Sequence, residues 1–495
     1  MPSNDSSLYG NGKEPKPSVD ADLAQREGSE IQDAQQRNVG ELAFDEYTSG
    51  GLGRHLGVLS TTFLVVGRII GTGIFSTPSS VTAELGSVGA SLMFWVLGLF
   101  LAAAGLCVWL EFACMIPRSG GEKNYLEAVY KKPKLLITIF FAVQAIALGF
   151  TASGCVVFAQ YILTAADVTV TEWGKRGIAI GVIVFITLFH TFLPKWGVRG
   201  MNVITGIKII VLLFIVVTGW VVLGGGVKSV PDPHASFRNA FAGSNHSGNL
   251  YATALFKVLN AYAGGHPEEV AKSGVTIAAF FMYKVFGHAA QRALSVLLAI
   301  SAFGNVLTVT FAQSRVNQEL AKEGVIPFPR FWASSWPFGS PSAGLLLHFI
   351  PSFIVIVAIP FGDAYNFILD LEGYPSSVVN FLVVFGLFYL RFKEPHTHRS
   401  FKVWWPIAAF FMAAQGFQLV APFLRPPGGK GDTSLPYWLY AVVGIAVLAA
   451  SIVYWFVWWV LLPRIGKYHL EPTHETLKDG THVVVYKSVK TSFKS

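Results

Sequence analysis

The stretch Val66-Gly67-Arg68-Ile69-Ile70-Gly71-Thr72-Gly73-Ile74-Phe75 lies inside an apolar run from Leu56 to Ala83. A run of about 20 or more apolar residues is typical of a membrane-spanning helix. Two glycines flanking a threonine disfavour a continuous helix, and non-helical backbone at membrane depth is tolerated only where it lines a cavity. The positive N-terminal end of the following half-helix would then suit a carboxylate. A glycine packing face or a simple kink explains these residues equally well.

The composition of the whole chain is that of an integral membrane protein. Of its 495 residues, 52% are hydrophobic and 13% are charged, against about 25% charged residues in soluble domains, and its mean hydropathy is +0.50. Long apolar runs between polar ends exclude soluble multidomain enzymes, disordered proteins, coiled coils and outer-membrane barrels. The net charge of +8 would suit nucleic acid, but the basic residues lie between apolar runs, where membrane orientation explains them better. We therefore expect a lipid bilayer and no nucleic acid as partner.

Ten apolar runs are long enough to cross a membrane, so the sequence predicts an all-α protein with about ten full spans. They are Leu56–Ala83, Val88–Leu110, Leu135–Ala166, Gly177–Leu193, Met201–Gly224, Ala289–Ala312, Ser342–Pro360, Ala364–Leu390, Val403–Leu424 and Leu435–Pro463. The uncharged run Leu135–Ala166 is long enough for one strongly tilted helix. Two further stretches, Leu250–Gly264 and Val275–Phe286, are too short to cross. Residues 1–53 have the polar composition of a disordered tail and no signal peptide.

The distribution of lysine and arginine predicts the orientation in the membrane. With the N-terminus inside, 25 of the 37 basic residues fall on the inner side, 8 on the outer side and 4 within spans. Both the N-tail, residues 1–53, and the C-tail, residues 464–495, are therefore expected in the cytoplasm. The plasma membrane is the expected location.

Several motifs resemble those of one transporter superfamily. The stretch Gly67–Phe75 looks like the first-helix motif of amino-acid permeases of the amino acid–polyamine–organocation (APC) superfamily. Other stretches resemble the second, sixth and eighth helices of that family: Glu111-Phe112 with Ile116–Glu122, Leu255–Gly264, and Ser301–Asn305 with Ser314-Arg315 and Ala321–Gly324. The resemblance covers residues 42–470 and is strongest to fungal high-affinity methionine permeases of the L-type branch.

This resemblance implies a LeuT-type fold with two inverted five-helix repeats and two further helices. The permease domain would span residues 54–463, with the first repeat at 54–226, an incomplete second repeat at 250–391 and the extra helices at 403–463. It implies a neutral amino acid as substrate, protons as the coupling ion, and neither a cofactor nor a metal. The carried-over substrate-binding residues come from the first, sixth and eighth helices: Ile69, Gly71, Thr72, Gly73, Asn260, Tyr262, Ala263, Gly264, Ser301 and Asn305. Asn260 stands where many L-type relatives have an aromatic gate.

Two charged residues within spans are candidates for ion coupling. Lys208 lies eight residues into Met201–Gly224, with apolar neighbours. A charge inside the membrane is a functional hypothesis by default, and a buried lysine can release its proton near neutral pH; a snorkelling side chain is the alternative. Asp370 is a second candidate for a proton relay or a substrate contact, although it could simply cap the helix. Arg68 and Lys257 could each pair with a carboxylate that the sequence does not identify.

Other classes of function stay open at this stage. His190 and His348 lie in apolar spans, as a membrane acyltransferase would require, but no Ser/His/Asp, HExxH or clustered ligand pattern accompanies them. Packing histidines that bond a neighbouring carbonyl are the better interpretation, so we expect no enzyme. An amino-acid sensor that does not transport would need the same site as a carrier.

The family pattern is interrupted after Gly264. It would continue with the second half of the sixth helix and a whole seventh helix, roughly 50 residues. Here Gly265-His266-Pro267-Glu268-Glu269 follows instead, resembling the outer loop before the eighth helix. Leu250–Gly264 would form a helix of only about 22 Å, too short to cross, so it should re-enter and turn back. A mis-joined exon, a splice variant or a divergent gene explains the gap, and we expect impaired insertion or transport.

Overall fold

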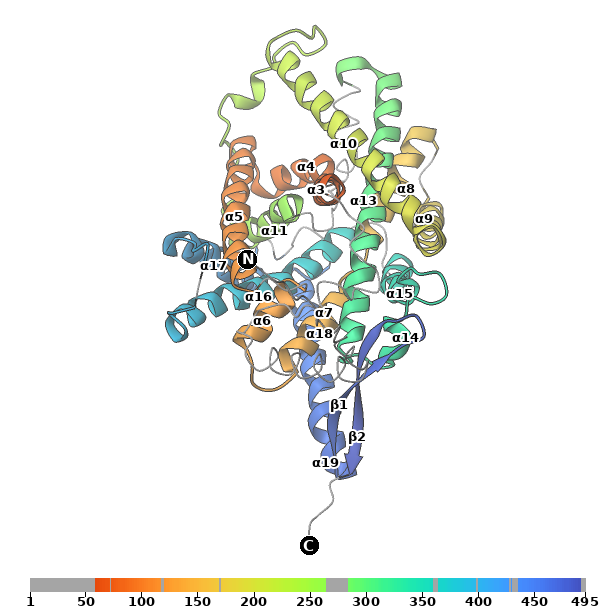
Figure 1. The fold of residues 1–495 in the computed structure, drawn as a ribbon. Helices are drawn as coiled ribbons and strands as arrows, with labels where there is room; N and C mark the ends of the chain where they lie inside the picture. Colours follow the sequence, from red (N-terminus) through yellow and green to blue (C-terminus); the bar gives the residue numbers. More distant parts are fainter. Residues whose placement is uncertain are drawn as a thin grey trace, which may run out of the picture.

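The structure is a computed structural model that describes residues 58–71, 73–116, 120–168, 171–263, 284–358, 364–397, 399–426, 429 and 435–490. Most of these residues are helical (Figure 1). The helices in chain order are α3 (Val58–Ile69), α4 (Gly73–Leu85), α5 (Val88–Met115), α6 (Glu122–Val129), α7 (Leu136–Ala147), α8 (Ala152–Ala166), α9 (Glu172–Phe192), α10 (Pro194–Leu223), α11 (Gly248–Ala263), α13 (His288–Lys322), α14 (Pro329–Ala333), α15 (Ser342–Ala358), α16 (Ala364–Lys393), α17 (Trp405–Val420), α18 (Leu439–Trp455) and α19 (Leu462–Gly466). Short turns η1 (Ala235–Phe237) and η3 (Ala421–Phe423) and a π-helical segment η5 (Phe456–Leu461) complete them.

The all-α membrane class is confirmed. Within the described ranges, eight helical stretches are long and apolar enough to cross a membrane. The two expected runs outside this set are also helical: α15 has 17 residues, and Leu56–Ala83 contains the two halves α3 and α4. The repeat boundaries at 226, 250, 391 and 403 stay a prediction, and residues 1–53 lie outside the described part of the chain.

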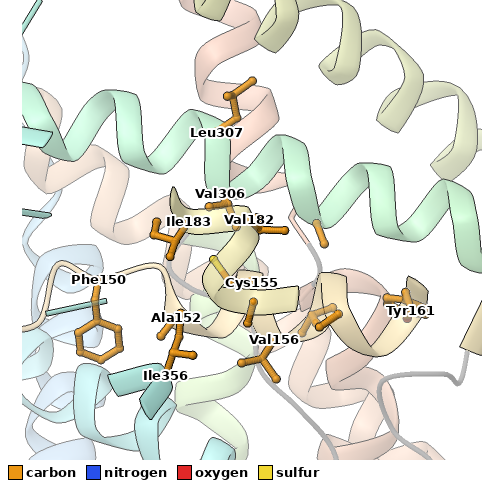
Figure 2. Packing of buried hydrophobic residues seen from close by; sticks show 14 of the residues in the cluster. Phe150, Ala152, Cys155, Val156, Tyr161, Val182, Ile183, Val306, Leu307 and Ile356 are labelled. Carbon is orange, nitrogen blue, oxygen red and sulfur yellow. The ribbon is translucent and has the colours of Figure 1, made fainter. Parts of the chain in front are cut away.

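Helix α13 occupies the centre of the molecule and is the most deeply buried of the candidate spans (Figure 1). It packs along α8, α15 and α10. Figure 2 shows part of the largest apolar cluster, in which Val306 of α13 lies beside Ile183 of α9 and Cys155 of α8. A helix buried on several sides holds its polar side chains at fixed positions, which matters for the site below.

We predicted one strongly tilted helix for the third apolar run. The structure instead has two helices there, α7 and α8, separated at Leu148–Thr151. Side chains of neighbouring helices bind the backbone groups near this break. Gln313 Nε2 donates to the Ala145 carbonyl at 2.8 Å, His348 Nδ1 lies 2.7 Å from the Gly149 carbonyl, and the Thr151 amide donates to Ser352 Oγ at 3.0 Å. A break at membrane depth is stable because these tertiary partners satisfy the backbone.

The C-tail contains a β-hairpin that we did not predict from the sequence. Strands β1 (Tyr468–Thr476) and β2 (His482–Lys490) pair antiparallel and lie at the opposite end of the molecule from the loop after α10 (Figure 1). Glu475 accepts two hydrogen bonds from Arg330, at 2.7 and 2.9 Å, and Lys487 lies 3.0 Å away. Its hydrogen bond with Arg330 is the main reason why the pKa of Glu475 falls to about 2. The hairpin is thereby docked on the segment between α13 and α15.

Candidate functional site

The quoted glycine stretch breaks the first span, which is one of the two explanations that its residues left open. Helix α3 ends at Ile69 and α4 begins at Gly73, with Ile70 and Gly71 between them outside any helix and Thr72 outside the described residues. The Gly71 amide donates to the Ile69 carbonyl at 2.9 Å, whereas in a continuous helix it would donate to Gly67. The break therefore releases the Gly67 carbonyl from the helical ladder, and the Arg68 carbonyl lies beside it in the last turn of α3.

Two side chains from other helices bind these two carbonyls. Lys208 Nζ of α10 donates to the Gly67 carbonyl at 2.9 Å, and Asn305 Nδ2 of α13 donates to the Arg68 carbonyl at 3.2 Å. Lys208 and Asn305 are each only 1% exposed. The ammonium group of Lys208 therefore contacts the backbone of the break in a buried position, and its role in coupling stays a prediction.

The glycines keep α3 close to α10 and α13. A Cβ atom on Gly71 would lie 2.7 Å from Asn305 Nδ2, and one on Gly304 would lie 3.1 Å from Lys208 Cε. A Cβ on Gly67 would collide with the Thr205 hydroxyl. A larger residue at Gly71 or Gly304 would press against Asn305 or Lys208, which bind these carbonyls, and one at Gly67 would press against Thr205.

Ser301 lies one helical turn before Asn305 on α13 and is 1% exposed. Among the described residues, its hydroxyl has no hydrogen-bond partner. The structure therefore brings together Ile69, Gly71, Asn305 and Lys208, with Ser301 on the same helix as Asn305. The first turn of α4, beginning at Gly73, contains no acidic residue that would neutralise its positive end.

The sixth-helix half of the predicted site is described only in part. Asn260, Tyr262 and Ala263 belong to the last turn of α11, where only the backbone is described, and Gly264 lies outside the described residues. The predicted turn after Gly264 and most of Val275–Phe286 lie outside them too. Asp370 is fully buried in α16, a helix that packs against α11 where Gly373 faces the Phe256 ring. Asp370 therefore lies on the α11 side of the molecule, and its role in coupling stays a prediction.

The carboxylate partners of Arg68 and Lys257 were not predictable, and the structure identifies them. Lys257 of α11 forms a buried ion pair with Glu84 of α4, and Arg68 interacts electrostatically with Glu122 and Glu372. The only signal in the sequence was the presence of opposite charges in apolar segments. Because 173 residues separate Glu84 from Lys257, no local pattern could join them.

The two intramembrane histidines have structural contacts. His190 Nε2 lies 3.0 Å from the Leu307 carbonyl. His348 contacts the Gly149 carbonyl through Nδ1 and the hydroxyls of Thr151 and Thr310 through Nε2. The described residues also contain no group of three or more His, Cys, Asp or Glu side chains that could hold a metal ion. The contacts agree with packing histidines that bond neighbouring carbonyls.

Comparison with known proteins identifies a family and several relatives. The family model described as "Amino acid permease" matches residues 56–266 and 261–448. The chain is 36% identical to the high-affinity methionine permease of Saccharomyces cerevisiae over 86% of this chain and 83% of that protein. It is 30% identical to the low-affinity methionine permease of the same yeast, over 86% of each. The human large neutral amino acids transporter small subunit 2 is 24% identical over 85% of this chain and 84% of that protein.

The alignment to the high-affinity permease also contains positions that no residue of this chain fills. The alignment to the high-affinity permease has 481 positions but includes 86% of this chain. Since 86% of 495 residues is about 426, about 55 positions of that alignment contain no residue of this chain. The two matches to the family model meet at residues 261–266, which is where the sequence pattern breaks off.

Proposed function

Because the chain belongs to the amino acid permease family of the APC superfamily and therefore transports amino acids across a membrane, we propose that its substrate is a neutral amino acid, with methionine favoured. The names of the two yeast relatives support methionine, and that of the human relative supports neutral amino acids in general. The family and its named transporters are not enzymes, so the acyltransferase alternative is set aside.

One observation carries the proposed binding mode. Lys208 and Asn305 already donate hydrogen bonds to the carbonyls at the break in the first span. The other polar feature of the break is the positive amino-terminal end of α4, which would bind a negative group. The substrate carboxylate would bind at Gly71, Thr72 and Gly73 through backbone amides, and the Gly71 amide would exchange its hydrogen bond to the Ile69 carbonyl for one to the carboxylate. Ser301 would contribute its hydroxyl, and the end of α11 from Asn260 to Gly264 would accept the substrate ammonium.

Lys208 is the proposed coupling residue. Its ammonium donates to the Gly67 carbonyl. Losing its proton would weaken that hydrogen bond, because a neutral amine is a poorer donor than an ammonium, and would loosen the contact between α3 and α10. Uptake would then be coupled to protons rather than to sodium, with Asp370 as a second candidate for the relay. The protein would act in the plasma membrane, with both ends in the cytoplasm.

The gap after Gly264 bears on how well this chain transports. About 55 alignment positions contain no residue of this chain. In our proposal they lie after Gly264 and would include the residues that complete the ammonium side of the site. We therefore expect weaker uptake than from a chain with the restored segment. The gap should affect the site more than the topology.

An uptake panel tests the proposal. Labelled methionine is supplied to cells that lack their own methionine uptake, and each unlabelled amino acid competes in turn. Competition by neutral but not by charged amino acids supports the proposal, and a transporting chain that methionine does not inhibit contradicts the methionine assignment. Binding of methionine by the purified protein without uptake by cells would identify a sensor. Equal uptake by this chain and the restored chain, at equal surface level, would show that the gap does not impair transport.

A further inference from the structure

The ion pair between Glu84 and Lys257 joins two half-length helices. Helix α4 has 13 residues and α11 has 16 within the described part of the chain, each fewer than the about 20 that a spanning helix needs. The side chain of Lys257 is 0% exposed and that of Glu84 is 6% exposed. Charges buried at membrane depth are costly. This pair joins α4 to α11, and the proposed substrate site lies at the amino-terminal end of α4 and the carboxy-terminal end of α11.

Glu84 is held by more than the lysine. Thr253 Oγ1, one turn before Lys257 on α11, lies 3.3 Å from Glu84 Oε2 and shares its one O–H between that oxygen and the Leu250 carbonyl at 3.0 Å. The Glu84 carbonyl accepts from Asn245 Nδ2 at 3.2 Å, and the Asn245 amide donates to the Leu85 carbonyl at 2.8 Å. The outer end of α4 is therefore fixed both to α11 and to the loop that precedes α11.

Adhesion between the two helices does not require these charges. Val81 and Leu85 of α4 already pack with Ala254 and Val258 of α11 in one buried apolar cluster. Replacing a buried ion pair by apolar residues is often neutral for stability. Apolar packing depends little on the angle between the two helices. An ion pair with an additional hydrogen bond is directional and favours one angle.

The angle of α4 determines where its inner end lies. Glu84 is eleven residues from Gly73, which is about 16 Å along the helix axis. A tilt of about 10° at the outer end would therefore move the first amides of α4 by about 3 Å, more than a hydrogen bond tolerates. Displacements of about 1 Å can already cost a hundredfold in activity at a preorganised site.

We propose that Glu84 and Lys257 are positioning residues for the substrate site: their ion pair sets the angle of α4 and thereby the place of its amino-terminal end, where the substrate carboxylate binds. This inference rests on the proposed function. Neither residue contacts the substrate in this arrangement.

Binding to the purified full-length chain tests the inference with two ligands. L-Methionine carries the carboxylate, and L-methioninol has the same side chain and amine but an alcohol in its place. The variant Glu84→Gln/Lys257→Met removes both charges together, so that neither is left buried alone. We expect its methionine affinity to fall about tenfold or more, while the weaker methioninol affinity changes less than about twofold. The charge-exchange variant Glu84→Lys/Lys257→Glu should recover most of the methionine affinity.

Two controls separate positioning from folding. The variant Arg330→Gln/Glu475→Gln removes an ion pair at the C-terminal hairpin and should leave both affinities unchanged. If the doubly neutral variant does not fold, Glu84→Asp keeps the charge but shortens the side chain, and it should weaken methionine binding alone.

Unchanged methionine affinity in a folded Glu84 variant would overturn the inference, as would equal losses for the two ligands, because the pair would then only hold the fold. A wild-type chain that binds no neutral amino acid would overturn the proposed function and this inference together.

Discussion

Replacing Lys208 by methionine tests the central contact of the site. Methionine keeps the length and apolar body of the lysine side chain but removes its three N–H donors. The Gly67 carbonyl, which accepts from Lys208 Nζ at 2.9 Å, then lacks its partner in a buried position. The only nearby group of the main chain that helical geometry would offer is the Gly71 amide, which now donates to Ile69.

The size of the effect follows from that single bond. A hydrogen bond to a charged group contributes about 1.5–3 kcal/mol, and an unsatisfied buried carbonyl costs about 1–3 kcal/mol. A bias of about 2 kcal/mol toward a continuous helix lowers the ratio of the broken to the continuous form by a factor of about 30. Since only the broken form exposes the end of α4, we expect methionine affinity to fall by up to about that factor.

The assay is initial uptake of labelled methionine between about pH 4 and pH 7.5, the range in which a buried lysine could exchange its proton. Lys208→Met should lower the apparent affinity and flatten the pH dependence of uptake, at a surface level measured for each variant. Lys228→Met, in an exposed loop after α10, is the matched control and should behave as wild type. If Lys208→Met retains both the affinity and the pH dependence of the wild type, Lys208 neither supports the break nor couples transport.

Three further outcomes follow from other contacts. Gly71→Ala places a methyl group 2.7 Å from Asn305 Nδ2 and should weaken methionine binding at least about tenfold, whereas Gly206→Ala, with no atom within 4 Å, should not; equal behaviour would contradict the close approach. The pKa of Glu475 is lowered to about 2, so its contribution to hairpin docking is complete above about pH 4.5 and is lost as the pH falls toward 2; pepsin should cleave the hairpin increasingly over that range, and Arg330→Gln should remove this dependence. Lys284→Cys should react with a membrane-impermeant maleimide from outside the cell, in a background without the three native cysteines, and labelling only after permeabilisation would mean that α11 crosses the membrane.

The first span could be predicted because its signal is local. Glycines at 71 and 73 weaken the helix wherever they stand, and Lys208 is conspicuous in any apolar run. The hairpin at the C-terminus was also predictable in principle, since Asp479-Gly480 is a typical hairpin turn and Val483 to Tyr486 have high strand propensity. Hydropathy does not identify this hairpin, because its exposed face is polar.

The remaining features depend on tertiary partners and leave no local signal. The third span can be interrupted at Gly149 because the side chains of Gln313 and His348 bind backbone carbonyls there. The sequence does not reveal this, since a lone glycine in an apolar run is more often a packing residue. The pairing of Glu84 with Lys257 likewise requires α4 and α11 to lie side by side. The sequence shows that Glu84 and Lys257 are charged, but only the fold shows that they pair with each other.

The position of the gap divides the proposed site into two unequal halves. The contacts of Lys208 and Asn305 with the broken first span use α3, α10 and α13, which are present in full on either side of the gap. The ammonium side would depend on the end of α11 and on the missing half-helix that should follow it. The carboxylate side can therefore persist where the ammonium side does not. For this reason the gap should first reduce the discrimination between an amino acid and its deaminated analogue, before it abolishes the binding of carboxylates.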